Sequence, residues 1–388
     1  MNRTSAGLGT LTRRQRELLR ALLIETTGAA GRSVDAEGMR YLVGAAPTIE
    51  LPAAAALHRV GGSVLRGLEG VDDVPAEALA ELTVLRQQSS LRHLLMTGAL
   101  GEIAQMFDGE QLTWLAMKGP VVAALLYPEA GDRMYTDLDL LVGRRDFPRA
   151  VKILEHLGFQ HRIRNWALAE KMLAGEIAMT RQSVCVDLHW HLHYSPQDRR
   201  PFAIDPEAMI ERRRHVTVSG VAAPTFDPVD TLLTLAFHAA RSDGHRLVWL
   251  KDAERSIVVE EPDVDELVRR CRQYHCAPPV GLILGRSQRL LGAPIPDEVV
   301  AALTPPALRI ADRTVAKLTH PVQLHDRPTL TRWFTRSVRS SVLTSLSDAP
   351  TRAARSLRRR LAPQPINETD NPVEKDGYLT AVAASIDR

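Results

Sequence analysis

Residues 137–142 read Asp-Leu-Asp-Leu-Leu-Val, an apolar run that carries two carboxylates one residue apart. Successive side chains of a β-strand alternate between its two faces, so Asp137 and Asp139 would share one face while the apolar side chains pack behind them. Two neighbouring anions repel each other unless a cation lies between them, and Mg²⁺ is the usual cation because it takes oxygen ligands. The pattern predicts a half-buried strand with a cation site. Its alternative is the solvated face of an edge strand.

The segment before this strand has the pattern of a strand, a turn and a helix. Residues 112–117 are mostly apolar and predict a buried strand, and residues 120–126 predict a helix that begins with proline, which the first helical turn favours. Lys118 and Gly119 lie at the turn, where glycine lets a phosphate approach the backbone and the helix N-terminus offers N–H donors. Lys118 and Arg133 would add charge-assisted contacts. The alternative is an ordinary turn.

A third carboxylate follows on another predicted strand. In residues 183–190 apolar side chains alternate with Cys185, Asp187 and His189, which therefore share a face. On a strand next to the acidic pair, Asp187 would complete a metal-binding cluster. In nucleotidyl transfer, metal ions neutralise developing charge and align the reacting oxygens, and a third carboxylate can accept the proton of an attacking hydroxyl.

Taken in order, these motifs resemble the uncharacterised bacterial nucleotidyltransferase family of the DNA polymerase β superfamily, over roughly residues 90 to 260. The resemblance rests on Lys118-Gly119, 126–128, Arg133, 137–142, 157–159 and 186–190, and it extends to His238 and 247–252. It implies an α+β fold with a small mixed sheet and helices, Asp137 and Asp139 as the metal-binding pair, Asp187 as the third carboxylate, and Gly119 as the phosphate-loop glycine. The superfamily usually has Gly-Gly or Gly-Ser at the turn, whereas Gly119-Pro120 has one N–H donor fewer.

Helical patterns flank the predicted core on both sides. We expect an N-terminal helical region at 1–107, a nucleotidyltransferase-like α/β core at 108–225, a C-terminal helical domain at 226–346 that walls one side of the cleft, and a basic segment with a mobile polar tail at 347–388. Asp227 and Pro228 would open the first C-terminal helix as its N-cap and first residue. Within the tail, residues 378–386 could form a short helix.

Three histidines offer a competing metal site. His189, His191 and His193 fall at alternate positions and would share a strand face, a geometry that suits zinc. Surface or hydrogen-bonded histidines are commoner, and we favour that interpretation. His189 would then orient Asp187 or contact the substrate.

Other conspicuous residues are interpreted as architecture. His238, Trp249 and Asp252 lie on predicted helices, and we expect a core histidine and structural contacts there. Gly61-Gly62 resembles a nucleotide-binding turn, but no predicted strand precedes it, so we expect a helix-breaking turn.

Composition limits the class of protein. The chain of 388 residues has 45% hydrophobic and 24% charged residues, which is typical of a globular protein of about two domains. Its net charge of +3 is too small to argue for nucleic-acid binding. No apolar run approaches the roughly 20 residues of a membrane span, and the first residues lack an apolar signal core. Three cysteines give no disulfide framework. We therefore expect a cytoplasmic location.

The sequence favours a nucleotidyltransferase that depends on Mg²⁺, or on Mn²⁺, and moves a nucleoside monophosphate from an NTP, with ATP as the first expectation, to an acceptor hydroxyl or phosphate. The alternative is a catalytically weak or inactive nucleotide-binding or regulatory protein that docks on a partner. A third hypothesis is a nucleic acid or acidic partner bound by the arginines between Arg352 and Arg360. We favour a docked amphipathic helix for that segment.

Overall fold

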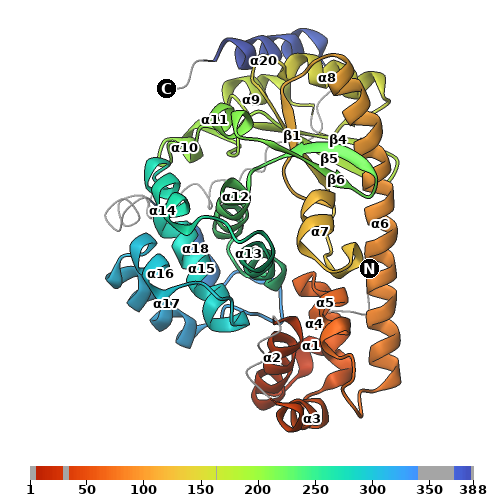
Figure 1. The fold of residues 1–388 in the computed structure, drawn as a ribbon, viewed down its shortest axis with the longest axis vertical. Coiled ribbons are helices and arrows are strands. Elements are labelled where there is room, and N and C mark those ends of the chain that lie inside the picture. The colour runs from red at the N-terminus through yellow and green to blue at the C-terminus, as the bar shows by residue number, and fades with distance from the viewer. Residues whose placement is uncertain (1–5, 29–34, 163, 340–370, 386–388) are drawn as a thin grey trace.

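The computed structural model describes residues 6–28, 35–162, 164–339 and 371–385 (Figure 1). The first helices are α1 (Ala6–Thr10), α2 (Arg13–Thr27), α3 (Ala36–Ala45), the 3₁₀ helix η2 (Thr48–Glu50), α4 (Leu51–His58) and α5 (Gly61–Gly67). The 34-residue helix α6 (Ala76–Gly109) then runs along one side of the molecule, from these helices to the sheet (Figure 1).

A mixed five-stranded sheet carries the acidic motifs. Its strands are β1 (Trp114–Ala116), β2 (Leu138–Val142), β3 (Gln160–His161), β4 (Glu176–Arg181) and β5 (Val184–His189), in the order β1-β2-β5-β4-β3. Only β2 and β5 pair in parallel, and every other neighbouring pair in this sheet is antiparallel. Between them run α7 (Pro120–Leu126), the 3₁₀ helix η3 (Ala130–Asp132), α8 (Phe147–His156) and α9 (Trp166–Lys171). The α+β class with helical flanks is confirmed.

A separate hairpin connects the sheet to the C-terminal helices. After α10 (Pro196–Arg199) and α11 (Pro206–Glu211), strands β6 (Arg214–Val218) and β7 (Val221–Thr225) pair with each other. There follow α12 (Pro228–Arg241), α13 (Leu247–Glu260), α14 (Val264–Gln273), α15 (Ala277–Leu291), α16 (Asp297–Leu303), α17 (Pro306–Leu318) and α18 (Leu330–Ser337). Prolines stand at the starts of several of these helices, where the missing N–H costs nothing.

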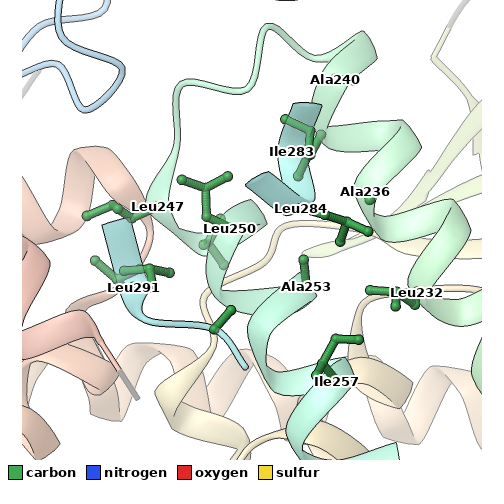
Figure 2. Packing of buried hydrophobic residues seen from close by; sticks show 14 of the residues in the cluster. Leu232, Ala236, Ala240, Leu247, Leu250, Ala253, Ile257, Ile283, Leu284 and Leu291 are labelled. Atoms are coloured by element: carbon green, nitrogen blue, oxygen red, sulfur yellow. The ribbon is translucent and has the colours of Figure 1, made fainter. Parts of the chain in front are cut away.

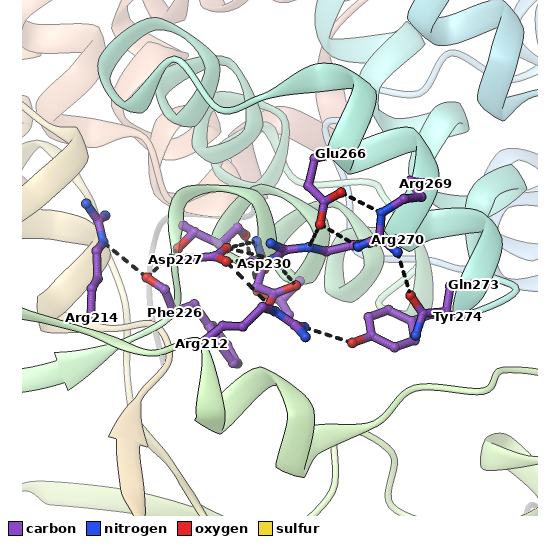
Figure 3. A network of polar contacts seen from close by, with 12 residues as sticks. Arg212, Arg214, Phe226, Asp227, Asp230, Glu266, Arg269, Arg270, Gln273 and Tyr274 are labelled. Atoms are coloured by element: carbon purple, nitrogen blue, oxygen red, sulfur yellow. Dashed lines mark hydrogen bonds and ion pairs between the residues drawn. The ribbon is translucent and has the colours of Figure 1, made fainter.

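The start of α12 is fixed by a cap and an ion-pair network (Figure 3). As predicted, Asp227 is the N-cap, and its side chain accepts a hydrogen bond from the Asp230 backbone N–H. Arg270 from α14 pairs with both aspartates, and Arg212 at the end of α11 pairs with Asp230. This network holds the first helix of the C-terminal group against the elements that follow the sheet.

Two hydrophobic cores organise the molecule. The larger one joins the N-terminal helices to the C-terminal helices, and its centre is the packing of α12, α13 and α15 (Figure 2). The residues labelled there recur at helical spacing: Leu232, Ala236 and Ala240 on α12, Leu247, Leu250, Ala253 and Ile257 on α13, and Ile283, Leu284 and Leu291 on α15. The second core lies between the sheet, the C-terminal half of α6, α8 and α9. Helix α6 therefore contributes to both cores.

The predicted mobile tail needs a correction. Residues 371–385 include helix α20 (Pro372–Ala384), which packs on α8 and α9. Tyr378 is fully buried there, stacks on Trp166, and donates a hydrogen bond to the carbonyl of Ala174 at 2.7 Å. An aromatic side chain and a hydrogen bond thus dock a segment whose polar composition suggested mobility. The arginines between Arg352 and Arg360 lie outside the described residues.

No helix within the described ranges is both long enough and apolar enough to cross a membrane.

Candidate active site

All seven residues that the sequence predicts for the site line one cavity of about 240 Å³ between the sheet, α7 and the C-terminal helices. They are Lys118, Gly119, Arg133, Asp137, Asp139, Asp187 and His189. Residues from α12 and α13, including Thr234, His238 and Trp249, form the opposite wall. The cavity therefore lies where the two hydrophobic cores meet.

The parallel pairing of β2 with β5 brings the carboxylates together. In this register Asp139 lies directly opposite Asp187, and Asp137 immediately precedes β2. The apolar residues between them are fully buried, so the strands are fixed by core packing on one face and carry carboxylates on the other. The predicted convergence of the three aspartates on one cavity is present in the structure.

Gly119 makes the turn between β1 and α7 possible. Its φ is +57° and its ψ is −121°, a conformation that only glycine adopts readily. A Cβ atom added there would lie 2.7 Å from the carbonyl oxygen of Asp137. The turn is thus packed tightly against the start of the acidic strand. Helix α7 has only seven residues, so its dipole is short.

Asp139 is the most strongly engaged carboxylate. Its Oδ1 lies 3.0 Å from Lys118 Nζ, and 3.4 Å from His189 Nε2. Burial alone would raise the pKa of Asp139, but the charges of Lys118 and His189 outweigh burial and lower it well below its usual range. Lys118 Nζ also lies 3.3 Å from Nδ1 of His238, whose pKa burial and the lysine charge lower to about 3. Lys118 is therefore an ion-pair partner of Asp139 in this structure.

Glu176 is a fourth carboxylate, which our sequence analysis missed. Its Oε2 lies 3.0 Å from His189 Nδ1, so the imidazole stands between Glu176 and Asp139. Burial would lower the pKa of His189, but the charges of these two carboxylates raise it to about 10. Both contacts are ion pairs with poor hydrogen-bond alignment. A signal did exist, because a two-residue turn at Gln182-Ser183 sets a register in which Glu176 pairs with His189.

The other two aspartates are less well compensated. Burial and the charge of Asp139 raise the pKa of Asp137. Burial also raises the pKa of Asp187 to about 6, with His189 opposing the shift and Asp139 and Asp137 adding to it. The four carboxylates thus carry two more charges than Lys118 and His189, the cations in direct contact with them.

Arg133 has a structural partner that the sequence did not reveal. Its Nε and Nη2 donate to the two carboxylate oxygens of Asp252 at 2.7 and 2.8 Å, and its Nη1 donates to the Gly119 carbonyl at 3.3 Å. Tyr127 also donates to Asp252, at 2.7 Å. This buried pair ties α13 to the turn. The predicted phosphate contact of Arg133 stays a prediction.

Some residues assigned to architecture lie on the cavity wall. His238, Trp249 and Asp252 all line it, although Asp252 also serves the structural pair with Arg133. His193 instead packs against Phe202 and Phe237, away from the carboxylates. The Gly61-Gly62 segment follows helix α4 rather than a strand, and it begins α5.

As they stand, no three or more His, Cys, Asp or Glu side chains within the described part of the chain are arranged to hold a metal ion. The donor chemistry nevertheless fits a hard divalent cation, because oxygen ligands with excess negative charge converge on the cavity. In this structure the cation that lies beside Asp139 is the ammonium group of Lys118.

A mixed sheet whose Asp-x-Asp strand pairs in parallel with a strand bearing a third carboxylate fits the nucleotidyltransferase class of proteins. The chain belongs to the uncharacterised nucleotidyltransferase family, whose model matches residues 49–292. Among solved structures, an antigenic nucleotidyltransferase-like protein from Paracoccidioides brasiliensis is similar at 14% identity and a TM-score of 0.31, over 56% of this chain and 96% of that chain. A comparison with curated proteins found no match.

Proposed function

We propose that the protein is an Mg²⁺-dependent nucleotidyltransferase that moves a nucleoside monophosphate from an NTP to an acceptor hydroxyl or phosphate and releases pyrophosphate. The observation that carries this proposal is the register of β2 and β5, which sets Asp139 opposite Asp187 with Asp137 beside them in one cavity. Family membership supports the class of reaction.

The metal would be held by Asp137, Asp139 and Asp187, and Mg²⁺ or Mn²⁺ suits their oxygen ligands. When bound, it would neutralise charge on the reacting phosphate. The carboxylates outnumber Lys118 and His189, the cations that contact them, and this supports a cation site here. Glu176 would hold His189 in place rather than bind the ion, because its carboxylate already faces the imidazole at 3.0 Å.

The residues of the chain would share the remaining work. Gly119 lets the triphosphate approach the backbone. Lys118 gives up its ion pair with Asp139 and offers its positive charge to the triphosphate instead. Asp187 accepts the proton of the acceptor hydroxyl. The hydroxyl oxygen bonds to the α-phosphorus, the bond between the α-phosphorus and the β-phosphate breaks, and pyrophosphate leaves. Burial beside other carboxylates raises the pKa of Asp187, which favours its acceptance of a proton.

Transfer is tested with NTPs labelled in the α-phosphate, ATP first, offered with small-molecule, protein and RNA fractions as acceptors. The Asp137→Asn, Asp187→Asn double variant removes two cluster carboxylates but keeps the contacts of Asp139. Label transfer and pyrophosphate release should be lost in it and retained in Asp72→Asn, Asp73→Asn, a control in a turn far from the cavity. Wild-type transfer by the cavity variant would refute the assignment.

A catalytically weak nucleotide-binding or regulatory protein is the second candidate. Two observations favour it: Lys118 already pairs with Asp139, and Gly119-Pro120 lacks one N–H donor. Saturable NTP binding without pyrophosphate release in any acceptor fraction would select this candidate. A partner bound by the arginines between Arg352 and Arg360 remains less favoured, and salt-independent RNA or DNA binding would remove it.

A further inference from the structure

Three arginines in the elements around the cavity have no carboxylate partner, and one of them, Arg92, is exposed. Arg59 lies in the turn between α4 and α5 and lines the cavity, Arg92 lies on α6, and Arg246 is the N-cap residue of α13. Among the residues that the structure describes, none of these three guanidinium groups takes part in an ion pair or a hydrogen bond. They come from three different parts of the chain.

Their charges act on one another and on the site. The positive charges of Arg246 and Arg92 lower the pKa of Arg59, after burial, while Asp137 opposes this shift. The charge of Arg92 also acts on Tyr135, which lines the cavity. Arg246 stacks over the cavity-lining Trp249, with its guanidinium carbon 5.8 Å from a ring centroid. Like charges held together in this way favour an anionic ligand.

Other arginines near the cavity differ from these three because they have carboxylate partners. Arg66 and Arg86 both pair with the buried Asp132, and Arg133 pairs with Asp252. Helix α5 thus carries the paired Arg66, whereas Arg59, in the turn just before this helix, lines the cavity unpaired.

The backbone at Arg59 is left-handed, as it is at eight other non-glycine residues that the structure describes. It has φ +58° and ψ +36°, the left-handed region that costs an L-residue about 1 kcal/mol or more and favours glycine at a helix C-cap. Its N–H closes α4 on the carbonyls of Ala55 and Ala56. Glycine is therefore a substitution that the backbone at this position accommodates.

We infer that Arg59, with Arg92 and Arg246, forms a polyphosphate-binding subsite at the edge of the cavity, next to the carboxylate cluster. This inference rests on the proposed function for its biological meaning. Guanidinium groups bind phosphate oxygens through paired charge-assisted hydrogen bonds. The polyphosphate has two possible sources: the β- and γ-phosphates of the NTP, or a phosphorylated acceptor.

The probe is inorganic tripolyphosphate, titrated into the full chain by calorimetry without Mg²⁺ at one low ionic strength, because salt screens such contacts. Arg59→Gly removes the guanidinium and suits the left-handed backbone, so it should fold. Loss of charged hydrogen bonds should weaken binding about 10- to 100-fold in this variant. Arg313→Ala, an exposed arginine on α17, changes net charge equally and should bind within about twofold of wild type. Should Arg59→Gly not fold, the Arg92→Gln, Arg246→Gln double variant replaces it.

Competition separates the two sources. If ATP displaces tripolyphosphate, the subsite binds the NTP; if both bind together, it binds a phosphorylated acceptor. Tripolyphosphate that fails to bind wild type, or binds Arg59→Gly as tightly, overturns the inference. Tripolyphosphate binding that depends on Arg59, with no binding of any NTP, keeps the subsite and removes the proposed function. A different result would keep the proposed function and remove the subsite. In that result NTP binding needs Mg²⁺ and the aspartates but not Arg59, and tripolyphosphate binding is also independent of Arg59.

Discussion

At the scale of single residues, the carboxylates of the cavity differ in how well their charge is compensated. Asp139 faces Lys118 and His189 at 3.0 and 3.4 Å, whereas Asp187 has a pKa raised to about 6 because it is buried near other carboxylates. The two residues lie opposite each other on paired strands, yet we expect their side chains to contribute to stability with opposite sign. This difference can be measured.

Asp187→Asn should stabilise the metal-free protein by roughly 1 kcal/mol at neutral pH while abolishing transfer, because it removes a crowded charge from a functional site. Asp139→Asn should instead cost about 2 kcal/mol or more, since it leaves Lys118 and His189 buried beside a neutral amide. Urea unfolding of both variants gives the two values. Destabilisation of equal size in both would contradict this account of the charges.

A second residue-scale prediction concerns Arg133. Arg133→Met leaves Asp252 buried with Tyr127 as its remaining side-chain donor, and breaking such a pair should cost roughly 3–5 kcal/mol. Arg13→Met breaks an exposed pair with Glu17 and should cost less than about 1 kcal/mol. Chemical denaturation distinguishes them, and a loss below about 1 kcal/mol in Arg133→Met would show that the pair is not structural.

At the scale of elements, α20 belongs to the α/β core despite its distance in sequence. Tyr378→Ala should lower stability by about 3–5 kcal/mol, because a fully buried aromatic side chain and its hydrogen bond are lost. Val373→Ala, on the same helix at 79% exposure, is the matched control and should have little effect. Equal melting temperatures for the two variants would mean that α20 is not docked in solution.

Local pattern predicted the elements that make the site. Alternation around Asp137 and Asp187 and the proline after Gly119 are short-range signals, and they located β2, β5 and α7 within a few residues. Arg59 reaches the cavity only through the packing of the turn between α4 and α5, and Asp252 meets Arg133 across 119 positions of sequence. Contacts of this kind depend on tertiary packing, which no local pattern encodes. The docking of Tyr378 was missed for the same reason.

At the scale of the whole molecule, the large helical core contains histidines that are held neutral. His58 donates to the Gln323 carbonyl at 2.8 Å and accepts from the Leu247 N–H at 3.2 Å, thereby joining α4, α13 and a C-terminal loop. Burial lowers its pKa to about 3, and it lowers those of His245 and His320 to about 4. In the unfolded chain these histidines have a pKa of about 6.5.

These lowered pKa values predict acid sensitivity. Above about pH 6.5 these three histidines are neutral in both the folded and the unfolded state. Below about pH 6.5 the unfolded chain binds protons that the folded chain does not. The free energy of unfolding therefore decreases as the pH decreases, by up to about 1.4 kcal/mol per pH unit for each histidine. His58→Gln keeps a donor and an acceptor and should reduce this slope between pH 6.5 and 4.5. Its offset from wild type should be constant between pH 7 and 8. An unchanged slope would show that His58 is not held neutral.

The most direct test of the central claim is a thermal shift with each of the four NTPs, with and without Mg²⁺. It compares the wild type with Asp137→Asn, Asp187→Asn, which keeps the ion-pair partners of Asp139. The account predicts that at least one NTP raises the wild-type melting temperature only with Mg²⁺, and that the double variant loses this rise. An equal rise in both proteins, or no rise with any nucleotide, would contradict a metal-dependent nucleotide site at these carboxylates.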